Sequence, residues 1–427
     1  MTSFNVLILS TADDGGAGVA AYKLSKLFLK MGHNPKLLVV RSTKRDAFID
    51  CISAKNNFLS RAINKLWHFY FGFFDDIPDY YFFDKDERYS FATAASIGKH
   101  LKGFRPDLII AGWASGFVNF KTLARLSLRY KAPAYFWLAD MGALTGGCHY
   151  AWECLGYTAS CNKCPALSNS FFKTAAANLK TRNKYVKYGN LQVIAGSQWV
   201  AKQAKSSKLF AHQDKILTTN CMVDRSIYTP VFLSSSAKIK MKIDPGFKVM
   251  FFAATSLSEK RKGAKFFYEC VQSLLNLLAA DHLDKLFVLL AGKDDFKISH
   301  FLTNLGVRHQ SLGFLHDERQ LSLAYQASDV YVSTSIQDSG PMMIGDALAC
   351  GTPVISFDIG LASDVIVNGY NGKVVDVGDS LNMALALEEF LFATVTSSKA
   401  FRKNAFETAK AFCSESFAQN ILQGLLP

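Results

Sequence analysis

Short apolar stretches alternate with amphipathic ones along this chain. Asn5–Ser10, Asp107–Ala111 and Val330–Thr334 are mostly apolar or β-branched on successive residues, which predicts strands buried on both faces. The stretches between such runs, for example Leu321–Asp329, repeat apolar residues at helical spacing. Strands that alternate with helices in this way predict parallel sheets covered by helices, the doubly wound α/β class.

The chain of 427 residues is too long for one hydrophobic core, so the alternation is expected to build two domains. A polar segment with three lysines lies near the middle of the chain and is predicted to be a hinge. The expected organisation is a first α/β domain over 1–230, a hinge linker over 231–246, a second α/β domain over 247–400 and C-terminal helices over 401–427.

The stretch Ser335–Phe357 has the pattern of a loop, a helix, a turn and a strand. Pro341 stands at the expected first helical position, where its missing N–H costs nothing. The helix is predicted over Met342–Cys350 and ends at Gly351, a residue that favours the left-handed conformation after a helix. The segment therefore predicts a helix that begins near the carboxyl end of a buried strand.

The N-terminus of this predicted helix is a candidate anion site. The backbone N–H groups of Gly340, Met342 and Met343 have no partner within the helix, and the helix dipole adds positive charge there. Asp338 in the loop can reach a group bound at this tip, and Asp346 can accept hydrogen bonds from hydroxyls alongside it. A phosphate ester of a sugar fits this combination. An ordinary strand–helix unit with capping Asp residues is the alternative.

Asp338 and Asp346 have seven residues between them, and the run Ala-x-x-x-Gly-x-Pro-Val follows over Ala347–Val354. This spacing resembles the donor-site signature of the retaining GT-B glycosyltransferases of family 4, which carry Glu where this chain carries Asp. The resemblance implies two Rossmann-like domains that face each other across a cleft, with the final helices returning towards the first domain. It also implies that Asp338 contacts the donor sugar, that Asp346 contacts the ribose, and that catalysis requires no cofactor.

The same resemblance extends to other parts of the chain. Arg261 and Lys262 stand where the family places a basic pair on the donor diphosphate, although the usual Gly-Arg at the start of that loop is absent. Phe314 stands where the nucleobase stacks, and Asn220–Pro230 resembles the segment between the two domains. The residues expected to bind the donor are Gly15, Gly16, Gly18, Arg261, Lys262, Gly313, Phe314, Ser339, Gly340, Pro341, Met342 and Met343.

The first predicted strand is followed by a glycine-rich turn that admits two interpretations. Gly16–Ala21 fits the loose dinucleotide fingerprint G-x-G-x-x-A, and Arg41, Lys44 and Arg45 after the second strand suit the 2′-phosphate of NADP. An NADP-dependent oxidoreductase is therefore an alternative, but it leaves the anion site of the second domain unexplained. A glycine-rich first loop is equally typical of the GT-B N-terminal domain, where it lies against the donor phosphates and the acceptor.

Asp140 follows the predicted strand Ala134–Leu138, at the edge where open α/β sheets bind ligands. It is the candidate to orient or deprotonate an acceptor hydroxyl, and a loop-capping Asp is the alternative. His149 is a candidate acceptor contact or zinc ligand, or a loop residue without either role. Asp338, Asp346 and Asp140 are thus the candidate catalytic residues.

Four of the nine cysteines fall within 17 residues, at Cys148, Cys154, Cys161 and Cys164. Thiolates at this spacing suit a structural zinc that would staple a long loop, and free or disulfide-forming thiols are the alternative. Redox catalysis is not expected, because no thioredoxin-like context surrounds the Cys-x-x-Cys run. The runs Thr-Gly-Gly-Cys-His-Tyr and Cys-x-x-Cys-Pro resemble a subgroup of glycosyltransferases that assemble polysaccharides.

Composition limits the cellular compartments and the binding partners that the protein is expected to have. Hydrophobic residues make up 49% of the chain and charged residues 19%, which is typical of a globular protein without a membrane-spanning run. The N-terminus has no secretory signal pattern, and an odd number of cysteines indicates a reducing cytosol. The net charge of +13 suits anionic lipid surfaces or phosphorylated substrates, since no nucleic-acid motif is present. The basic, aromatic segment Phe58–Phe74 is either a membrane-surface helix or an insertion helix.

These patterns together favour a glycosyltransferase of the hexosyltransferase type. The expected reaction moves a sugar from a UDP- or GDP-sugar to a hydroxyl of a glycan or polyprenyl-phosphate-linked acceptor, with retention of configuration. The expected setting is bacterial surface polysaccharide assembly (O-antigen, capsule or exopolysaccharide). It takes place in the cytoplasm or at the inner face of the plasma membrane, without nucleic acid. A non-catalytic GT-B-like scaffold that binds lipid or polymer is a further alternative, since both signature acids are Asp.

Overall fold

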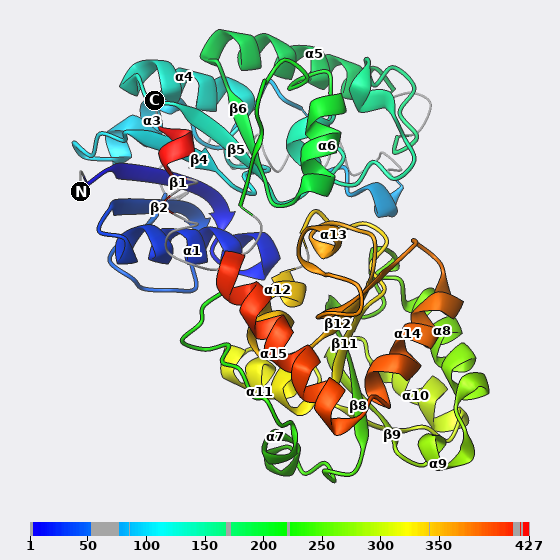
Figure 1. Cartoon of the computed structure of the whole chain (residues 1–427). Coiled ribbons are helices and arrows are strands. Elements are labelled where there is room, and N and C mark those ends of the chain that lie inside the picture. The colour runs from blue at the N-terminus through cyan, green and yellow to red at the C-terminus, as the bar shows by residue number, and fades with distance from the viewer. Residues whose placement is uncertain are drawn as a thin grey trace. The chain divides into compact units, whose positions relative to one another are not determined.

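The computed structural model of the protein describes residues 3–52, 77–84, 86–167, 172–219, 223–340, 342–412, 419 and 422–426. The chain divides into two compact units, Met1–Thr219 with Ala418–Pro427 (unit 1) and Asn220–Phe417 (unit 2). Each unit contains one parallel sheet with helices packed on it (Figure 1). The fold class expected from the sequence, two Rossmann-like α/β domains, is confirmed. The basic segment Phe58–Phe74 lies outside the described residues.

Unit 1 is built on a seven-stranded sheet with the strand order β3-β2-β1-β4-β5-β6-β7. Every strand pair in it is parallel. The strands are β1 (Asn5–Ala12), β2 (Asn34–Arg41), β3 (Ile49–Cys51), β4 (Leu108–Ala111), β5 (Ala134–Leu138), β6 (Gln192–Ala195) and β7 (Leu217–Thr218). The α-helices are α1 (Gly15–Lys30), α3 (Ala94–His100), α4 (Phe120–Tyr130), α5 (Phe172–Gly189) and α6 (Gln198–Ser206).

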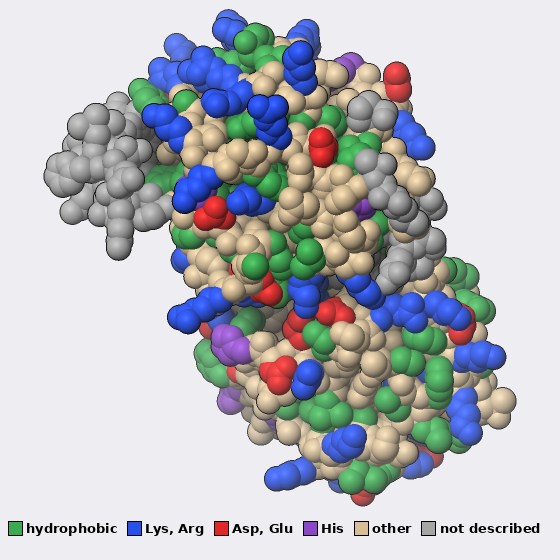
Figure 2. Space-filling model, turned by 90° about the vertical axis from the view of Figure 1, so that its left-hand side faces the viewer, with side chains coloured by type: hydrophobic (Ala, Val, Ile, Leu, Met, Phe, Trp, Pro, Cys, Tyr) green, Lys and Arg blue, Asp and Glu red, His purple; other side chains and the backbone are tan. Residues whose placement is uncertain are grey.

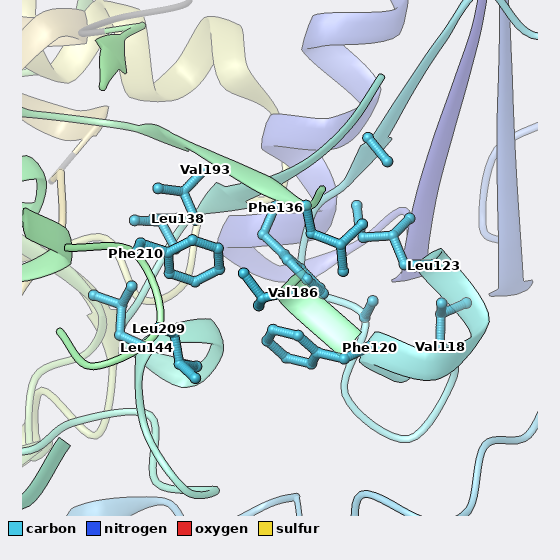
Figure 3. Close-up of a cluster of buried hydrophobic side chains, with 14 of the residues drawn as sticks. Val118, Phe120, Leu123, Phe136, Leu138, Leu144, Val186, Val193, Leu209 and Phe210 are labelled. Atoms are coloured by element: carbon cyan, nitrogen blue, oxygen red, sulfur yellow. The ribbon is translucent and has the colours of Figure 1, made fainter. Parts of the chain in front are cut away.

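The core of unit 1 lies between this sheet and its helices. Phe120 of α4 and Val186 of α5 point towards Phe136 of β5 (Figure 3), and the Phe120 and Phe136 ring centroids are 4.3 Å apart. All five residues of β5 are buried, as the continuous apolar run predicted. Near the C-terminus, the carbonyl of Leu425 accepts a hydrogen bond from Tyr135 Oη at 3.0 Å, which ties residues 422–425 to this sheet.

Unit 2 is built on a six-stranded parallel sheet with the order β10-β9-β8-β11-β12-β13. The strands are β8 (Lys248–Ser256), β9 (Leu286–Lys293), β10 (Arg308–Ser311), β11 (Val330–Ser333), β12 (Val354–Phe357) and β13 (Gly372–Val375). The α-helices are α7 (Ser235–Lys240), α8 (Ala264–Leu277), α9 (Ala280–Leu283), α10 (Phe296–Asn304), α11 (Glu318–Ala327), α12 (Met342–Ala349), α13 (Ala362–Val365), α14 (Ser380–Leu391) and α15 (Val395–Phe412). Over the residues described, no helix combines the length and the apolarity that a bilayer crossing needs.

Two strand-order reversals mark where each sheet can bind a ligand. In unit 1 the order reverses between β1 and β4, and in unit 2 it reverses between β8 and β11. At such a point the loops after the two strands leave in opposite directions and open a crevice at the carboxyl edge. The strand Val330–Ser333 and the helix Met342–Ala349 confirm the predicted segment that follows the second reversal.

The polar stretch predicted as a hinge forms helix α7 inside unit 2. Lys238 of this helix is buried, and its ammonium donates to Asp329 Oδ2 and to the carbonyl of Phe247, each at 2.7 Å. A lysine whose charge is paired and hydrogen-bonded in this way can be buried. Residues 235–240 of the predicted hinge linker therefore form a helix, and a hinge over 231–246 stays a prediction.

Candidate functional site

The candidate donor site lies at the strand-order reversal of unit 2. The loop after β8 contains one 3-10 turn, Lys260–Lys262, and Gly263 ends it with a φ of 70°. A side chain at Gly263 would come within 1.9 Å of the Thr334 carbonyl oxygen, so only glycine fits there. The Ile336 N–H donates to the Arg261 carbonyl at 2.8 Å. These contacts hold the basic turn against the loop that precedes α12.

Arg261, Lys262, Asp338 and Glu259 form a compact ion cluster at this point. Asp338 Oδ2 lies 2.5 Å from Lys262 Nζ and 3.2 Å from Arg261 Nη1, and Arg261 Nε lies 2.5 Å from Glu259 Oε1. Burial raises the pKa of Asp338, but the charges of Lys262 and Arg261 outweigh it, so this pKa lies below its ordinary value. Two cations face two carboxylates, and the cluster carries no net charge.

At the N-terminus of α12, one of the backbone N–H groups predicted to bind an anion is already hydrogen-bonded within the protein. Asp338 Oδ1 accepts a hydrogen bond from the Gly340 N–H at 3.3 Å, so this expected anion donor already has a partner. Of the other predicted residues, Ser339 is buried, Met342 and Met343 are half-buried, and Pro341 lies outside the described residues. An anion at this tip therefore competes with the carboxylate of Asp338.

Asp346 lies inside α12 and is buried. Burial raises the pKa of Tyr228 and of Tyr325 far above the ordinary value, and the nearby charge of Asp346 contributes in both cases. The structure thus places this carboxylate close to two phenol groups of unit 2. Its contact with a donor ribose stays a prediction.

Gly313 and Phe314 follow β10, at the carboxyl edge of the same sheet. The Phe314 ring is partly exposed, with Lys293 Nζ 5.3 Å from its centroid and the His316 ring 4.7 Å away. The Gly313 carbonyl accepts a hydrogen bond from the Gly292 N–H at 2.8 Å, which ties the end of β10 to the end of β9. An exposed ring at this edge can stack on a base, as predicted for Phe314.

The glycine-rich segment begins helix α1 directly instead of forming a separate loop. A side chain at Gly18 would come within 2.7 Å of the Ala12 carbonyl oxygen, so this glycine lets α1 pack against the end of β1. Added side chains at Gly15 and Gly16 would meet no atom of the described residues within 4 Å, so the helix start is open to a bound group. Gly15 has a φ of 68°, so the chain enters the helix through a left-handed conformation that favours glycine.

Two of the three cations that would hold an NADP 2′-phosphate are engaged elsewhere. Arg41 Nη2 lies 2.8 Å from Asp14 Oδ1, and Lys44 Nζ donates to the Asp13 carbonyl at 2.9 Å. Arg45 is exposed. These contacts favour a structural role for the segment after β2.

A second group of polar residues lies at the carboxyl edge of unit 1, where Asp140 follows β5. His149 Nδ1 lies 2.7 Å from Asp140 Oδ2, and His149 Nε2 lies 2.9 Å from Ser115 Oγ. Ser115 in turn donates to Asp84 Oδ1 at 2.6 Å, and the Gly142 N–H donates to Asp140 Oδ1 at 2.7 Å. Burial lowers the pKa of His149, but the carboxylates of Asp140 and Asp84 raise it to about 10. The imidazole is therefore protonated at neutral pH.

Three charged residues that the sequence did not single out support this group. Arg182 of α5 is buried and lies 2.7 Å from Asp84 Oδ2 and 2.9 Å from Glu87 Oε2. It also donates to the carbonyls of Gly142 and Thr145. Burial raises the pKa of Asp84, but Arg182, His149 and Ser115 together outweigh it, so this pKa lies below its ordinary value. Arg182 and Asp84 are 98 residues apart in sequence, so no local spacing predicts that they pair. Within the aromatic stretch around Asp84, the acidic residues Asp84 and Glu87 were the sequence feature that could have marked this site.

Aromatic rings border the Asp140–His149 pair. Phe83 is 50% exposed, and its ring centroid lies 5.0 Å from that of His149 and 5.9 Å from that of Trp113. Tyr81 stacks edge-on against Phe83 at 5.7 Å. A half-exposed ring beside buried charges suits a ligand that has both an apolar face and hydroxyl groups.

Cys148, Cys154, Cys161 and Cys164 line one cavity of about 10 Å³, which has room for about one water-sized body. All four are free thiols, and burial raises the pKa of Cys148 to about 12 and that of Cys161 to about 11. Both ring nitrogens of His149 are engaged by Asp140 and Ser115, away from these sulfurs. Within the part of the chain that the structure describes, no three metal-ligating side chains are placed to share one ion, and structural zinc stays a prediction.

Sequence comparison connects unit 2 to known proteins. Residues 237–408 match the family described as Glycosyl transferases group 1. The D-inositol 3-phosphate glycosyltransferase of Paenarthrobacter aurescens (strain TC1) is 26% identical over 196 residues, which are 44% of this chain and 46% of that protein. The match therefore spans less than half of that relative's length.

Structure comparison covers the whole chain. A glycosyltransferase from Rickettsia africae ESF-5 has a TM-score of 0.67 at 16% identity, over 100% of this chain and 98% of that one. Alr3699/HepE from Anabaena, in complex with UDP-glucose, has a TM-score of 0.65 at 16% identity, over 99% of each chain. At this identity the likeness shows a shared fold, the pair of Rossmann-like domains called GT-B.

Proposed function

We propose, from the match of residues 237–408 to the Glycosyl transferases group 1 family, that the protein is a glycosyltransferase. It transfers a sugar from a nucleotide-sugar donor to an acceptor hydroxyl. The observation that carries this proposal is the ion cluster of Arg261, Lys262 and Asp338 in front of α12. A leaving nucleoside diphosphate gains negative charge, and fixed cations at a helix N-terminus stabilise it.

The donor binds in unit 2 by exchange with a carboxylate. Because Arg261 and Lys262 already face Asp338, the diphosphate takes over the two cations and releases Asp338 towards the sugar. Phe314 stacks on the base, and Asp346 lies further along α12 for the ribose. A UDP-sugar is the favoured donor, since a structural neighbour binds UDP-glucose, and a GDP-sugar is the alternative.

The acceptor binds in unit 1. Both oxygens of Asp140 already accept hydrogen bonds, from the Gly142 N–H and from protonated His149, so Asp140 orients the acceptor hydroxyl and does not deprotonate it. The exposed Phe83 ring supplies an apolar surface for a sugar of the acceptor.

The finer parts of the proposal come from the motif resemblance. They are membership of family 4, retention of configuration, catalysis without a cofactor, and a role in assembling bacterial surface polysaccharide such as O-antigen. The acceptor is a glycan or a polyprenyl-phosphate-linked sugar. The protein works in the cytoplasm, at the inner face of the plasma membrane, where such acceptors are held; the net charge of +13 supports this placement.

A thermal-shift panel with UDP, GDP, ADP, dTDP, CMP and NADPH tests the proposal. One nucleoside diphosphate is expected to raise the melting temperature, because a ligand that binds only the native state stabilises it. A rise with NADPH alone would overturn the transferase in favour of an oxidoreductase. A flat response to every compound, followed by no transfer from the corresponding sugar nucleotides, would favour a non-catalytic scaffold.

A further inference from the structure

Helices α4 and α5 of unit 1 carry a strongly basic outer surface. Lys or Arg occupies three positions of α4 and five of α5, and neither helix contains Asp or Glu. Seven of the cations on these helices or directly after α4 are exposed, and six of them, all except Lys173 at the start of α5, are called the basic face here. They are Arg125, Arg129, Lys131, Lys180, Lys184 and Lys187.

The two helices form one continuous surface because small residues meet between them. A side chain added at Gly189 of α5 would come within 2.5 Å of the Ala124 Cβ in α4, and Ser127 Oγ donates to the Gly189 carbonyl at 3.4 Å. Figure 2 shows Lys and Arg side chains gathered over the top of unit 1, with few Asp or Glu among them. The cations of both helices therefore act on a partner together.

No residue that the structure describes forms an ion pair with any of the six cations of the basic face. Like charges one helical turn apart, as in Arg125 with Arg129 and Lys180 with Lys184, destabilise a helix. This arrangement of cations therefore does not stabilise the fold. A partner of opposite charge would gain from it, because such a surface attracts anions over about a Debye length.

Apolar side chains stand among these cations. Leu128 is 48% exposed and Tyr188 is 58% exposed, next to Arg129 and Lys187 in sequence. Lysines with long apolar stems beside Leu and Tyr are suited to a lipid headgroup layer, where the ammonium meets phosphates and the stem meets the acyl boundary. Lysines outnumber arginines four to two, whereas bidentate recognition of nucleic acid favours arginine.

We propose that the basic face docks unit 1 onto an anionic phospholipid surface, with its cations at the headgroup phosphates and Leu128 and Tyr188 at the interface. The purpose of this contact rests on the proposed function, since it would bring the protein to a polyprenyl-phosphate-linked acceptor. The contact itself does not depend on transfer activity. Each cation near such a surface contributes about fivefold in affinity.

Co-sedimentation of the full chain with lipid vesicles tests this inference. The probes are vesicles of 30% phosphatidylglycerol in phosphatidylcholine and vesicles of pure phosphatidylcholine, at about 0.1 M salt. Binding to the anionic vesicles alone is expected, and it should weaken as salt is raised. The triple variant Lys180→Gln, Lys184→Gln, Lys187→Gln is expected to bind about 100-fold more weakly, because three cations are neutralised.

A matched variant separates this face from net charge. Lys240→Gln, Lys285→Gln, Lys403→Gln neutralises three exposed lysines of unit 2 and is expected to bind like the wild type. Equal losses in both triple variants, or no binding of the wild type to anionic vesicles, would overturn the inference. Tighter binding of duplex DNA than of vesicles, lost in the Lys180 triple variant, would reassign the face to nucleic acid.

Measuring donor turnover in solution distinguishes a failure of the docking inference from a failure of the proposed function. Circular dichroism of both variants confirms that they fold. Hydrolysis of the sugar nucleotide without vesicles is expected to be the same in the wild type and in both triple variants, because none of the six lysines belongs to the donor or acceptor site. Vesicle binding without any donor turnover would remove the transferase proposal and leave the docking surface standing.

Discussion

At the scale of single residues, Asp338 contacts both the basic pair and the start of α12. It neutralises Arg261 and Lys262 in the free protein, and it accepts a hydrogen bond from the Gly340 N–H at the start of α12. A carboxylate in this place weakens anion binding while it keeps the two cations ordered. The same residue is the one expected to contact the donor sugar, so affinity and catalysis should respond to its loss in opposite directions.

The substitution Asp338→Asn is expected to tighten binding of the preferred nucleoside diphosphate about tenfold, since it removes a competing charge from the cations. Transfer of the sugar should fall at least about 100-fold, because a charged contact to the reacting group is lost. Calorimetric titration and a transfer assay measure the two effects. Asp376→Asn, at an exposed position of unit 2, is the control. Undiminished turnover would remove Asp338 from the mechanism.

His149 makes the stability of unit 1 depend on pH. Its folded pKa of about 10 lies above the ordinary value of 6.5. The stabilisation from its charge is therefore complete below pH 6.5 and is lost as the pH rises through about 10. His149→Asn should cost about 3–5 kcal/mol of unfolding free energy at pH 6, as for other broken buried ion pairs, and the difference from the wild type should shrink towards pH 10.

Urea unfolding at pH 6, 8 and 10 measures this difference. His212→Asn, at an exposed histidine of the same unit, is the control and should show no such trend. A cost for His149→Asn that stays constant over this range would mean that the imidazole is neutral in the folded protein.

At the scale of elements, the donor site depends on one backbone contact between two loops. Gly263 combines a φ of 70° with a 1.9 Å approach of an added side chain to the Thr334 carbonyl. Gly306, in the turn before β10, has nearly the same φ of 69°, but an added side chain there would meet no atom of the described residues within 4 Å. The two glycines thus share the backbone strain and differ in the contact.

Gly306→Ala is expected to cost about 1 kcal/mol of stability from the positive φ alone. Gly263→Ala should cost a further 1–3 kcal/mol or so, because the backbone must shift, and it should weaken nucleoside diphosphate binding by displacing Arg261 and Lys262. Thermal unfolding and calorimetric titration of both variants check this. Equal effects of the two substitutions on binding would show that the loop contact does not position the cations.

Over the described residues between β5 and α5, 139–167, the helical turns are short 3-10 turns, and the four cysteines of this loop line one cavity. A zinc ion would draw these thiols together and deprotonate them, which overcomes the raised pKa values of Cys148 and Cys161. Metal analysis of protein purified without chelator decides between the two alternatives, and about one zinc per chain would support a metal-bound loop. Absence of zinc, with all nine thiols titrated by a thiol reagent in denaturant, would leave a loop held by packing alone.

At the scale of the whole molecule, unit 2 contains the basic pair, Phe314 and Asp346, whereas the expected donor contacts Gly15, Gly16 and Gly18 belong to unit 1. The sheet of unit 2 has a core on each face: Phe252 stacks on Phe267 of α8 at 4.1 Å, and Phe251 packs on Tyr325 of α11 at 5.2 Å. Neighbouring residues of β8 thus point to opposite sides, as strand geometry requires. A unit with a core on both faces of its sheet is expected to fold as an independent domain.

Residues 220–417 expressed alone are expected to unfold cooperatively and to bind the preferred nucleoside diphosphate within about threefold of the full chain, because unit 2 has its own core. Thermal unfolding and calorimetric titration compare the fragment with the full chain. A folded fragment that fails to bind would mean that the donor site needs residues of unit 1.

Local hydrophobic patterns in the sequence predicted much of the fold. The alternation of apolar strands and amphipathic helices predicted two parallel α/β domains, and Val330–Ser333 with Met342–Ala349 appeared where the spacing placed them. The exceptions were places where a polar residue finds a distant partner. Lys238 is buried in α7 because Asp329 pairs with it, and that pairing joins residues 91 apart in sequence.

Local patterns were enough to predict the α/β class and the order of the elements, because hydrophobic periodicity is a property that each strand and helix satisfies alone. The sequence also pointed to Asp140 from a predicted strand end and to Asp338 from a predicted helix start, and the resemblance to glycosyltransferases added Arg261 and Lys262. The contacts between distant segments depend on the fold: Asp338 pairs with the two cations, Arg182 of α5 pairs with Asp84 beside His149, and the cations of α4 and α5 form one face. Charges act on one another through space, and their positions in space are set by the fold.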